Sequence, residues 1–484
     1  MKKLITALLL LAMVSSMIPA MMLGSSAAAI TPDTSWYTDA AYTANGNKYL
    51  LEDAADVLGF SNLLAGIGVT APQNFEGKTV ELTKSVDLGG NTWALLKGAI
   101  NDDATRPESR DPLEFSVLQN YGFWGTFDGK GNSIYNFKFD GYENDSNDAH
   151  DCTLFGIVPK GKTATVKNLV ISSANIEVSY FCGAIFSTVE GTATIDSVHL
   201  NNYVKVHACG QSIAIMAGRV MPSGNLTIKN CVVAAELNDS WTKDRLDGGL
   251  VAASYGTLTI QDTAFYGKMT KTSGEGNFQT SAHAGIVQKL GKDANYTGTN
   301  YAPSITLKNV IVNATIADTY NAGATTNKVT YITKEIPVGV SSNISNLFYV
   351  QTTKELTGVS ATKINDTDIK GTTASSFLTS KGLTNWTATK DYVVPTAIKE
   401  IMYPTPVVIN PPETTAPETT KAPETTKAPE TTKAPETTKA AATTTAAPAE
   451  EKGGCGSSVA LASVAMVTAV GACATIVCKK KKDD

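Results

Sequence analysis

The sequence predicts an all-β protein, a right-handed parallel β-helix, and two recurring patterns support this prediction. A nine-residue pattern occurs five times, and a glycine-rich pattern, GGLV at residues 248–251, returns as CGAIF at residues 182–186 and HAGIV at residues 283–287. Self-similarity of this kind indicates a repeat architecture. The nine-residue copies are TATVKNLVI ending at Ile171, TATIDSVHL ending at Leu200, NLTIKNCVV ending at Val233, TLTIQDTAF ending at Phe265 and SITLKNVIV ending at Val312.

Each nine-residue copy reads as a strand with one apolar face. In the first copy, Ala164 and Val166 alternate with polar residues, the phase slips near Asn168, and the alternation resumes at Leu169 and Ile171. A period of two residues is typical of a strand. The slip predicts a bend at the asparagine.

The spacing of the copies predicts how these strands stack. Most recur at intervals of 29 to 33 residues, with one longer gap before the last. A strand with one apolar face cannot bury that face alone, so successive copies stack in parallel. A weaker third strand, NIEV before Ser179 or YVKV before His207, gives three walls per coil, and the remaining residues form loops.

The residues also carry a family resemblance. GGLVAASYGTLTIQDTAF, at residues 248–265, resembles the GLUG-type repeat of bacterial surface proteins. Upstream, NFEGKTVELTKSVDLGGNTW and GFWGTFDGKGNSIYNFKF resemble the first coils of such proteins, and FLTSKGLTNWTATKDYVVPTAIK is similar to their closing segment. The resemblance covers about residues 49–401. It implies a β-helix at the bacterial surface, in a group that contains both adhesins and polysaccharide-active enzymes.

The amino terminus predicts export and a capped solenoid. Lys2 and Lys3, an apolar run and the small residues before Ala29 are typical of a signal peptide over residues 1–29, cleaved near Ala29; a retained membrane anchor is the alternative. The head then spans residues 30–403. An amphipathic stripe predicts a helix over residues 52–66, which would cover the open end of the first coil.

After the head the composition changes abruptly. Residues 404–452 repeat TTKAPE, cannot form a core and predict an extended, disordered Thr/Pro stalk. Residues 453–478 combine a small-residue motif with an apolar run long enough for a transmembrane helix, and the basic tail 479–484 would remain in the cytoplasm. There is no LPxTG motif. Cys455, at the outer membrane border, is either a processing site or a plain spacer thiol.

Charge and catalytic patterns restrict the function. A net charge of -5 gives no reason to expect nucleic acid as a partner. No series of paired carboxylates suits glycoside hydrolysis, and no catalytic residue or cofactor site is predicted. The charged residues Arg219, Lys243, Arg245 and Asp247 fit scattered solvent-side positions better than a lyase site. The acidic residues 142–151 could bind Ca²⁺, but they lack the residue order of a calcium loop.

Aromatic side chains near turns supply the candidate ligand-binding residues, because they could stack on sugars or pack between loops. They are Tyr180, Tyr203, Trp241 and Tyr255.

Four cysteines raise the question of disulfides. Cys231 occupies an apolar strand position and is expected to be a buried thiol. The positions of Cys152, Cys182 and Cys209 before the second strand of their coils allow either bridges or a stack of free thiols.

The leading functional hypothesis is a cell-surface adhesion protein of the bacterial envelope, anchored in the membrane or wall. Its head would bind a polysaccharide or a neighbouring surface protein. The alternative is a polysaccharide lyase or glycoside hydrolase of β-helix type, with its site among the loops at residues 101–111, 142–151 and 241–247.

Overall fold

A computed structural model of the chain describes residues 29–94, 122–141, 153–178, 182–208, 213–239, 246–271, 282–291, 303–316, 336, 339–350 and 359–403. These residues all belong to the first of two units into which the chain divides, Met1–Val408. The stalk, the predicted membrane span and all of the signal peptide except Ala29 lie outside them. Among the described helices, none is both long and apolar enough to cross a bilayer.

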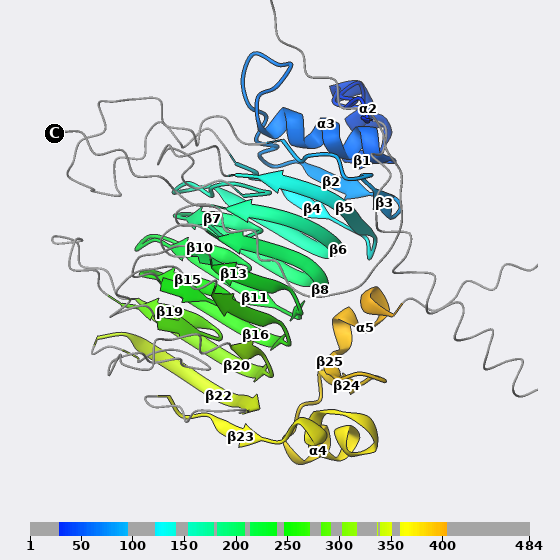
Figure 1. Cartoon of the computed structure of the whole chain (residues 1–484). Helices are drawn as coiled ribbons and strands as arrows, with labels where there is room; N and C mark the ends of the chain where they lie inside the picture. The colour runs from blue at the N-terminus through cyan, green and yellow to red at the C-terminus, as the bar shows by residue number, and fades with distance from the viewer. Residues whose placement is uncertain are drawn as a thin grey trace, which may run out of the picture. The chain divides into compact units, whose positions relative to one another are not determined.

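The head is a parallel β-helix, as the repeats predict (Figure 1). One large sheet runs its length in the order β1-β2-β4-β6-β8-β11-β16-β20-β22-β23. Every pair along this path is parallel, because each strand returns one coil later beside its predecessor. These strands are β1 (Tyr49–Leu51), β2 (Thr79–Leu82), β4 (Thr126–Asp128), β6 (Thr163–Val178), β8 (Thr192–Ala208), β11 (Asn225–Lys229), β16 (Thr257–Phe265), β20 (Ser304–Val312), β22 (Ser341–Val350) and β23 (Thr362–Ile364).

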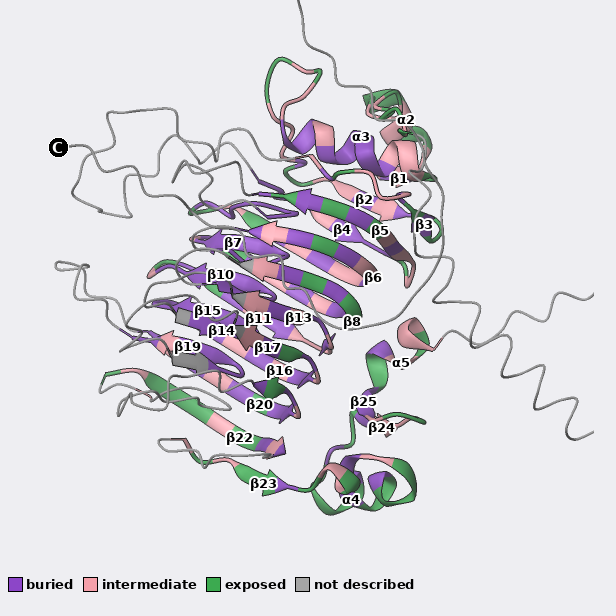
Figure 2. Cartoon of the chain, viewed as in Figure 1, coloured by how far each residue is buried: buried purple, intermediate pink, exposed green. Residues whose placement is uncertain are grey.

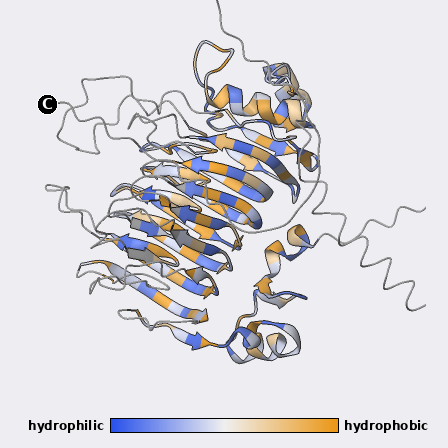
Figure 3. Cartoon of the chain, viewed as in Figure 1, coloured by the Kyte–Doolittle hydropathy of each residue, from blue (hydrophilic) through white to orange (hydrophobic). Residues whose placement is uncertain are grey.

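The sequence repeats stack residue on residue. Ala164 pairs with Ala193 and Leu226 with Leu258, so that equivalent apolar positions form straight columns inside the solenoid. Within each strand, burial alternates as the sequence pattern predicts, and Figures 2 and 3 show the alternation of burial and of hydropathy along the strands. Removal of these apolar columns from water makes the main favourable contribution to the free energy of folding.

A column of residues with positive φ makes the bend predicted at the asparagine. One residue in each of six successive coils adopts the left-handed conformation, which asparagine and aspartate tolerate better than most residues. Side-chain hydrogen bonds join neighbouring coils here, from Asn309 Nδ2 to Asp262 Oδ1 at 2.7 Å and from Asn346 Nδ2 to Asn309 Oδ1 at 2.9 Å. The column consists of Asn168, Ser197, Asn230, Asp262, Asn309 and Asn346.

The glycine-rich motif lies where successive coils approach most closely. A Cβ atom on Gly249 would stand 2.1 Å from the carbonyl oxygen of Gly285, and one on Gly183 would stand 2.4 Å from the nitrogen of Ala217. Two smaller parallel sheets flank the glycine-rich motif: the strands in the order β18-β14-β9 precede it, and those in the order β19-β15-β10-β7 follow it. Their strands are β7 (Phe186–Val189), β9 (Ile213–Ala214), β10 (Ala217–Val220), β14 (Leu246–Gly248), β15 (Val251–Ser254), β18 (Ala282–Ala284) and β19 (Val287–Leu290).

The remaining strands of the large sheet complete the coils. In two coils the chain after the bend belongs to the same long strand, β6 or β8. In the other coils it forms separate strands. They are β3 (Val86–Asp87), β5 (Ser133–Asp140), β12 (Val232–Val233), β13 (Glu236–Asp239), β17 (Lys268–Lys271) and β21 (Thr315–Ile316).

Helix α3 (Ala54–Leu64) lies across the amino-terminal end of the solenoid, preceded by the short helix α2 (Asp39–Ala44) (Figure 1). Asp53 begins α3 as its N-cap, since its side chain accepts hydrogen bonds from the nitrogens of Ala55 and Asp56. Phe60 packs its ring within 5.1 to 5.7 Å of the rings of Phe75, Phe123 and Phe127. The helix therefore shares the core of the first coils.

The carboxyl-terminal segment 362–403 does not end at the last coil but runs back along the outside of the large sheet. We call it the C-terminal strap. After β23 it contains two 3₁₀ turns, η4 (Asp366–Ile369) and η5 (Gly371–Thr373), helix α4 (Ala374–Ser380), the antiparallel pair β24 (Trp386–Ala388) and β25 (Val393–Pro395), and helix α5 (Thr396–Met402). It encloses a second apolar cluster, separate from the solenoid core.

Candidate functional site

One wall of the solenoid presents a regular polar surface. It is built from β5, the second halves of β6 and β8, β13 and β17, which pair in parallel. Val204, Val206 and Leu237 point into the core, and their neighbours in sequence are partly or fully exposed. We call this surface the charged wall and define it by Lys138, Asn175, Glu177, Tyr203, Lys205, Glu236 and Lys268.

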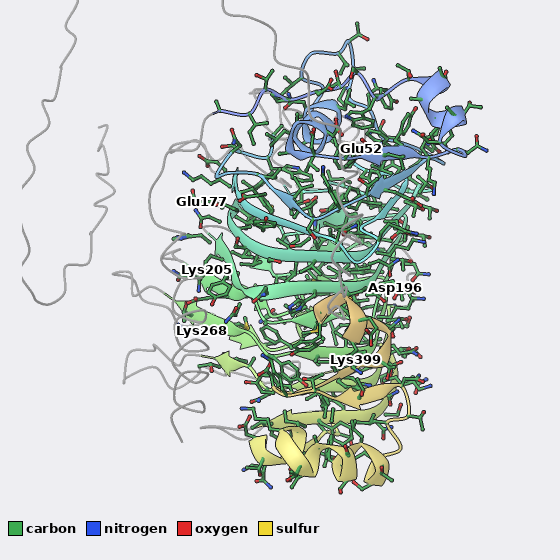
Figure 4. The ribbon with its side chains drawn as sticks, turned by 90° about the vertical axis from the view of Figure 1, so that its right-hand side faces the viewer. Glu52, Glu177, Asp196, Lys205, Lys268 and Lys399 are labelled. Carbon is green, nitrogen blue, oxygen red and sulfur yellow. The ribbon has the colours of Figure 1, made fainter. Side chains whose placement is uncertain are left out.

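An ion-pair ladder crosses the centre of the charged wall. Glu236 pairs in register with Lys205 on one side and Lys268 on the other. Its carboxylate contacts the ammonium groups of both lysines, at 3.1 Å for Lys268. Figure 4 shows Lys205 and Lys268 along one edge of the ribbon, below Glu177.

The ladder sets the ionisation of Glu236. Partial burial of this side chain opposes its negative charge, but the hydrogen bonds and charges of Lys205 and Lys268 outweigh burial and hold its pKa below the ordinary value. The wall therefore keeps both signs of charge at neutral pH, with the lysine side chains about half exposed.

Tyr203 rises from the charged wall. Its side chain is 59% exposed, and among the described residues it is the one large hydrophobic side chain that is exposed. It pairs in register with Ser173, and on the same coil as Ser173 the amide of Asn175 donates to the carboxylate of Glu177 at 3.4 Å. An aromatic ring beside amide, carboxylate and ammonium groups can stack on a sugar face while the polar groups bind its hydroxyls.

Of the other aromatic candidates, Tyr255 alone lies among the described residues. Tyr255 was expected to be exposed, and that expectation is wrong: the residue is 5% exposed. The ammonium group of Lys289, on the following coil, lies 5.7 Å from its ring centroid and helps to cover it. Tyr180 and Trp241 lie outside the described residues.

Two of the charged residues considered for catalysis, Arg219 and Asp247, are described, and neither is on the solvent side. Arg219 is 4% exposed and Asp247 is 1% exposed, so the expectation of solvent-side charges is wrong for both. Nε of Arg219 donates to Oγ1 of Thr188 on the preceding coil at 2.7 Å. Thr188 lies on β7 and Arg219 on β10, and these two strands and the neighbouring β15 are buried at every residue. Lys243 and Arg245 lie outside the described residues.

The described residues give no sign of a metal centre. No group of three or more histidine, cysteine, aspartate or glutamate side chains gathers among them. The acidic residues 142–151 fall outside that part of the chain, as does the loop at 101–111. His199 points away from the solenoid core, but it is 7% exposed, and its Nδ1 lies 2.9 Å from the carbonyl oxygen of Val232.

Two cysteines, Cys182 and Cys231, lie among the described residues, and both are fully buried. Cys231 is a free thiol and occupies the apolar strand position predicted for it. Burial is the main reason that the pKa of the Cys231 thiol rises to about 12. Cys152, Cys209 and Cys455 lie outside the described residues. Ala29, the candidate cleavage residue, is exposed where the described chain begins.

Sequence reasoning missed most of the charged wall. Of the aromatic candidates that the structure describes, Tyr203 alone lies on it, while Lys205, Glu236 and Glu177 were not singled out. A signal was present: the third strands YVKV, ELND and KMTK place a charged residue at equivalent positions of successive coils. Aligning these short segments requires the register of the stronger repeats first.

No protein-family model matches the sequence, and no curated protein matches it. Among solved structures, the chain is similar to a crystal structure described as "a putative immunoglobulin A1 protease from Bacteroides ovatus". The two are 15% identical with a TM-score of 0.43, and the similarity covers 73% of this chain and 93% of the other. A similarity of this extent carries no statement about function.

Proposed function

We propose that this protein is an adhesin-like display protein of the cell envelope, whose β-helix head binds a glycan or a polymer-coated surface through the charged wall. The observation that carries the proposal is the exposed Tyr203 ring among ordered polar side chains on a regular wall. Residues 1–29 would direct export, residues 453–478 would anchor the chain, and residues 404–452 would hold the head away from the membrane.

A glycan is the ligand that the charged wall suits best. The defining residues of the charged wall include three lysines and two glutamates, so its net charge is small and does not favour a polymer of one charge sign. The stacked coils repeat similar polar groups at the strand spacing of about 4.8 Å, which favours an extended, repetitive ligand over a single small molecule. Tyr203 would provide the apolar contact, and Asn175 and Glu177 the hydroxyl contacts.

The test is a binding and turnover screen of the full chain against neutral and charged polysaccharides, with and without Ca²⁺. We expect retention without new reducing or unsaturated ends. The Tyr203→Ala chain should bind at least about fivefold more weakly, because stacking of a nucleic-acid base on an aromatic side chain contributes about 1–3 kcal/mol and we expect a similar contribution from a sugar face. Lys399→Ala, on a different side of the head (Figure 4), is the control.

Two outcomes would count against the proposal. New reducing or unsaturated ends would favour a polysaccharide-cleaving enzyme instead. Binding that Tyr203→Ala and Lys399→Ala leave equally strong would place the ligand away from the charged wall. Fractionation of the producing cells tests the anchor separately, since an anchored chain would be recovered with membranes or wall.

A further inference from the structure

The C-terminal strap contacts the coils of the solenoid in reverse order, from the last coil toward the first. At its start, β23 pairs with β22, and Asn313 Nδ2 donates to Asp366 Oδ1 at 2.7 Å just after β20. Further on, Trp386 Nε1 donates to Asp262 Oδ1 of β16 at 3.1 Å. At the strap's end, the side chain of Ile401 lies 3.7 Å from the position of a Cβ on Gly131, in the turn between β4 and β5. The strap thus spans most of the solenoid.

Beneath the strap lies a continuous, mostly apolar stripe on the outer face of the large sheet. Its members pair with one another from coil to coil, and apart from His199 they are apolar. All are buried, although they point away from the solenoid core. Four of them belong to the apolar cluster of the strap rather than to the solenoid core. The stripe consists of Val170, His199, Val232, Ala264, Ile311 and Phe348.

The path of the strap determines how it would respond to a pull. The described chain leaves the strap at Tyr403, beside α5, near the coils of the amino-terminal half. A pull on residues beyond Tyr403 therefore loads α5 first, then β24 and β25, and reaches α4 last. Contacts loaded one after another separate at lower force than contacts loaded together, because each step breaks only a few of them.

We propose that the strap is a releasable clasp, which tension on the chain beyond Tyr403 peels from the head and so uncovers the apolar stripe. This inference rests on the anchoring part of the proposed function, since an anchored stalk is the source of tension. Among the described residues, two polar contacts hold the middle of the strap, from Trp386 to Asp262 and from the phenol of Tyr266 to the carbonyl oxygen of Val393 at 2.6 Å, beside the apolar cluster that the strap encloses. The helices and short strands of the strap contact the solenoid much less extensively than neighbouring coils contact one another, and such elements open locally before the whole domain unfolds.

Single-molecule pulling of the full chain after removal of the signal peptide tests the clasp, with handles attached at residues 30 and 453. Residues 362–403 span on the order of 140 Å when extended, at about 3.5 Å per residue. We expect a first extension on the order of 100 Å, reversible and at low force, before the coils unfold. In Tyr266→Phe, release at a fixed force should be roughly fivefold faster, the effect of one lost hydrogen bond.

Tyr203→Phe is the matched control, since it removes a phenol oxygen away from the strap and should leave the first extension unchanged. Trp386→Phe provides a second probe and should act in the same direction as Tyr266→Phe. A single rupture of the whole head, or equal effects of Tyr266→Phe and Tyr203→Phe, would overturn the clasp. Failure of the proposed function would instead appear as lost glycan retention or as a chain absent from the envelope fraction.

Discussion

The phenol oxygen of Tyr266 donates a hydrogen bond to the carbonyl oxygen of Val393 at 2.6 Å, joining residues 127 positions apart. The ring of Tyr266 also stacks on that of Tyr392, with centroids 4.5 Å apart. Through these contacts a coil in the middle of the solenoid is fixed to a segment that follows the last coil.

Removing this hydrogen bond should weaken the head measurably. Tyr266→Phe keeps the stacked ring but leaves the Val393 carbonyl without its donor, so we expect the free energy of unfolding to fall by about 1 kcal/mol. Chemical denaturation of the full chain, followed by tryptophan fluorescence, measures it. Tyr203→Phe should change the same quantity by less than about 0.5 kcal/mol. Equal losses in the two variants would contradict the role assigned to Tyr266.

His199 should make the stability of the head depend on pH. Burial under the strap lowers the pKa of this imidazole from 6.5 to about 4, because the charged form is poorly solvated there. The unfolded chain binds the proton near pH 6.5 and the folded chain only near pH 4. Stability is therefore full above pH 6.5 and falls between pH 6.5 and 4, by up to about 3 kcal/mol.

His199→Val isolates this effect. Valine occupies the adjacent positions of the same column, Val170 and Val232, so the substitution suits the stripe. The variant should lose the part of the pH dependence between 6.5 and 4 that His199 causes. Urea denaturation at a series of pH values measures it, and an unchanged profile in His199→Val would assign the dependence to other groups.

The asparagine column should show two separable contributions. Asn230 has a φ of 54°, and its amide donates to the Asp196 carboxylate at 2.8 Å. Asn230→Ala loses the hydrogen bond and strains the backbone, so we expect a loss of about 2 kcal/mol. Asn230→Gly keeps the backbone relaxed and should lose about half as much. If glycine proved as damaging as alanine, backbone strain would not matter at this position.

Cys231 should resist modification in the native protein. Its thiol is fully buried and has a pKa of about 12, so almost none of the reactive thiolate forms at pH 8. Alkylation followed by mass spectrometry of the Cys231 peptide should show labelling in denaturant and almost none in buffer. Labelling of the native chain at the rate of an exposed cysteine would be inconsistent with a core position.

The solenoid could be predicted because its sequence pattern is repeated in successive coils. Each copy around Asn168, Asn230 and Asn309 contributes the same alternation and the same bend, so the copies together determine the register. The strap occurs once, and nothing in its own sequence shows which coils it covers. The burial of Tyr255, Arg219 and Asp247 could not be predicted from the sequence either. It depends on contacts with neighbouring coils and on whether both faces of a wall are covered.

The strap also has a consequence for how the protein can change its length. Repeat domains commonly gain or lose whole units, because each unit contacts only its neighbours. Here Trp386 must reach Asp262 while Ile401 reaches Gly131, and the chain between them has a fixed length. An inserted or deleted coil between Gly131 and Asp262 would move one of these partners by about 4.8 Å and leave the segment out of step. The length of the strap therefore restricts how many coils the head can contain between these two contacts.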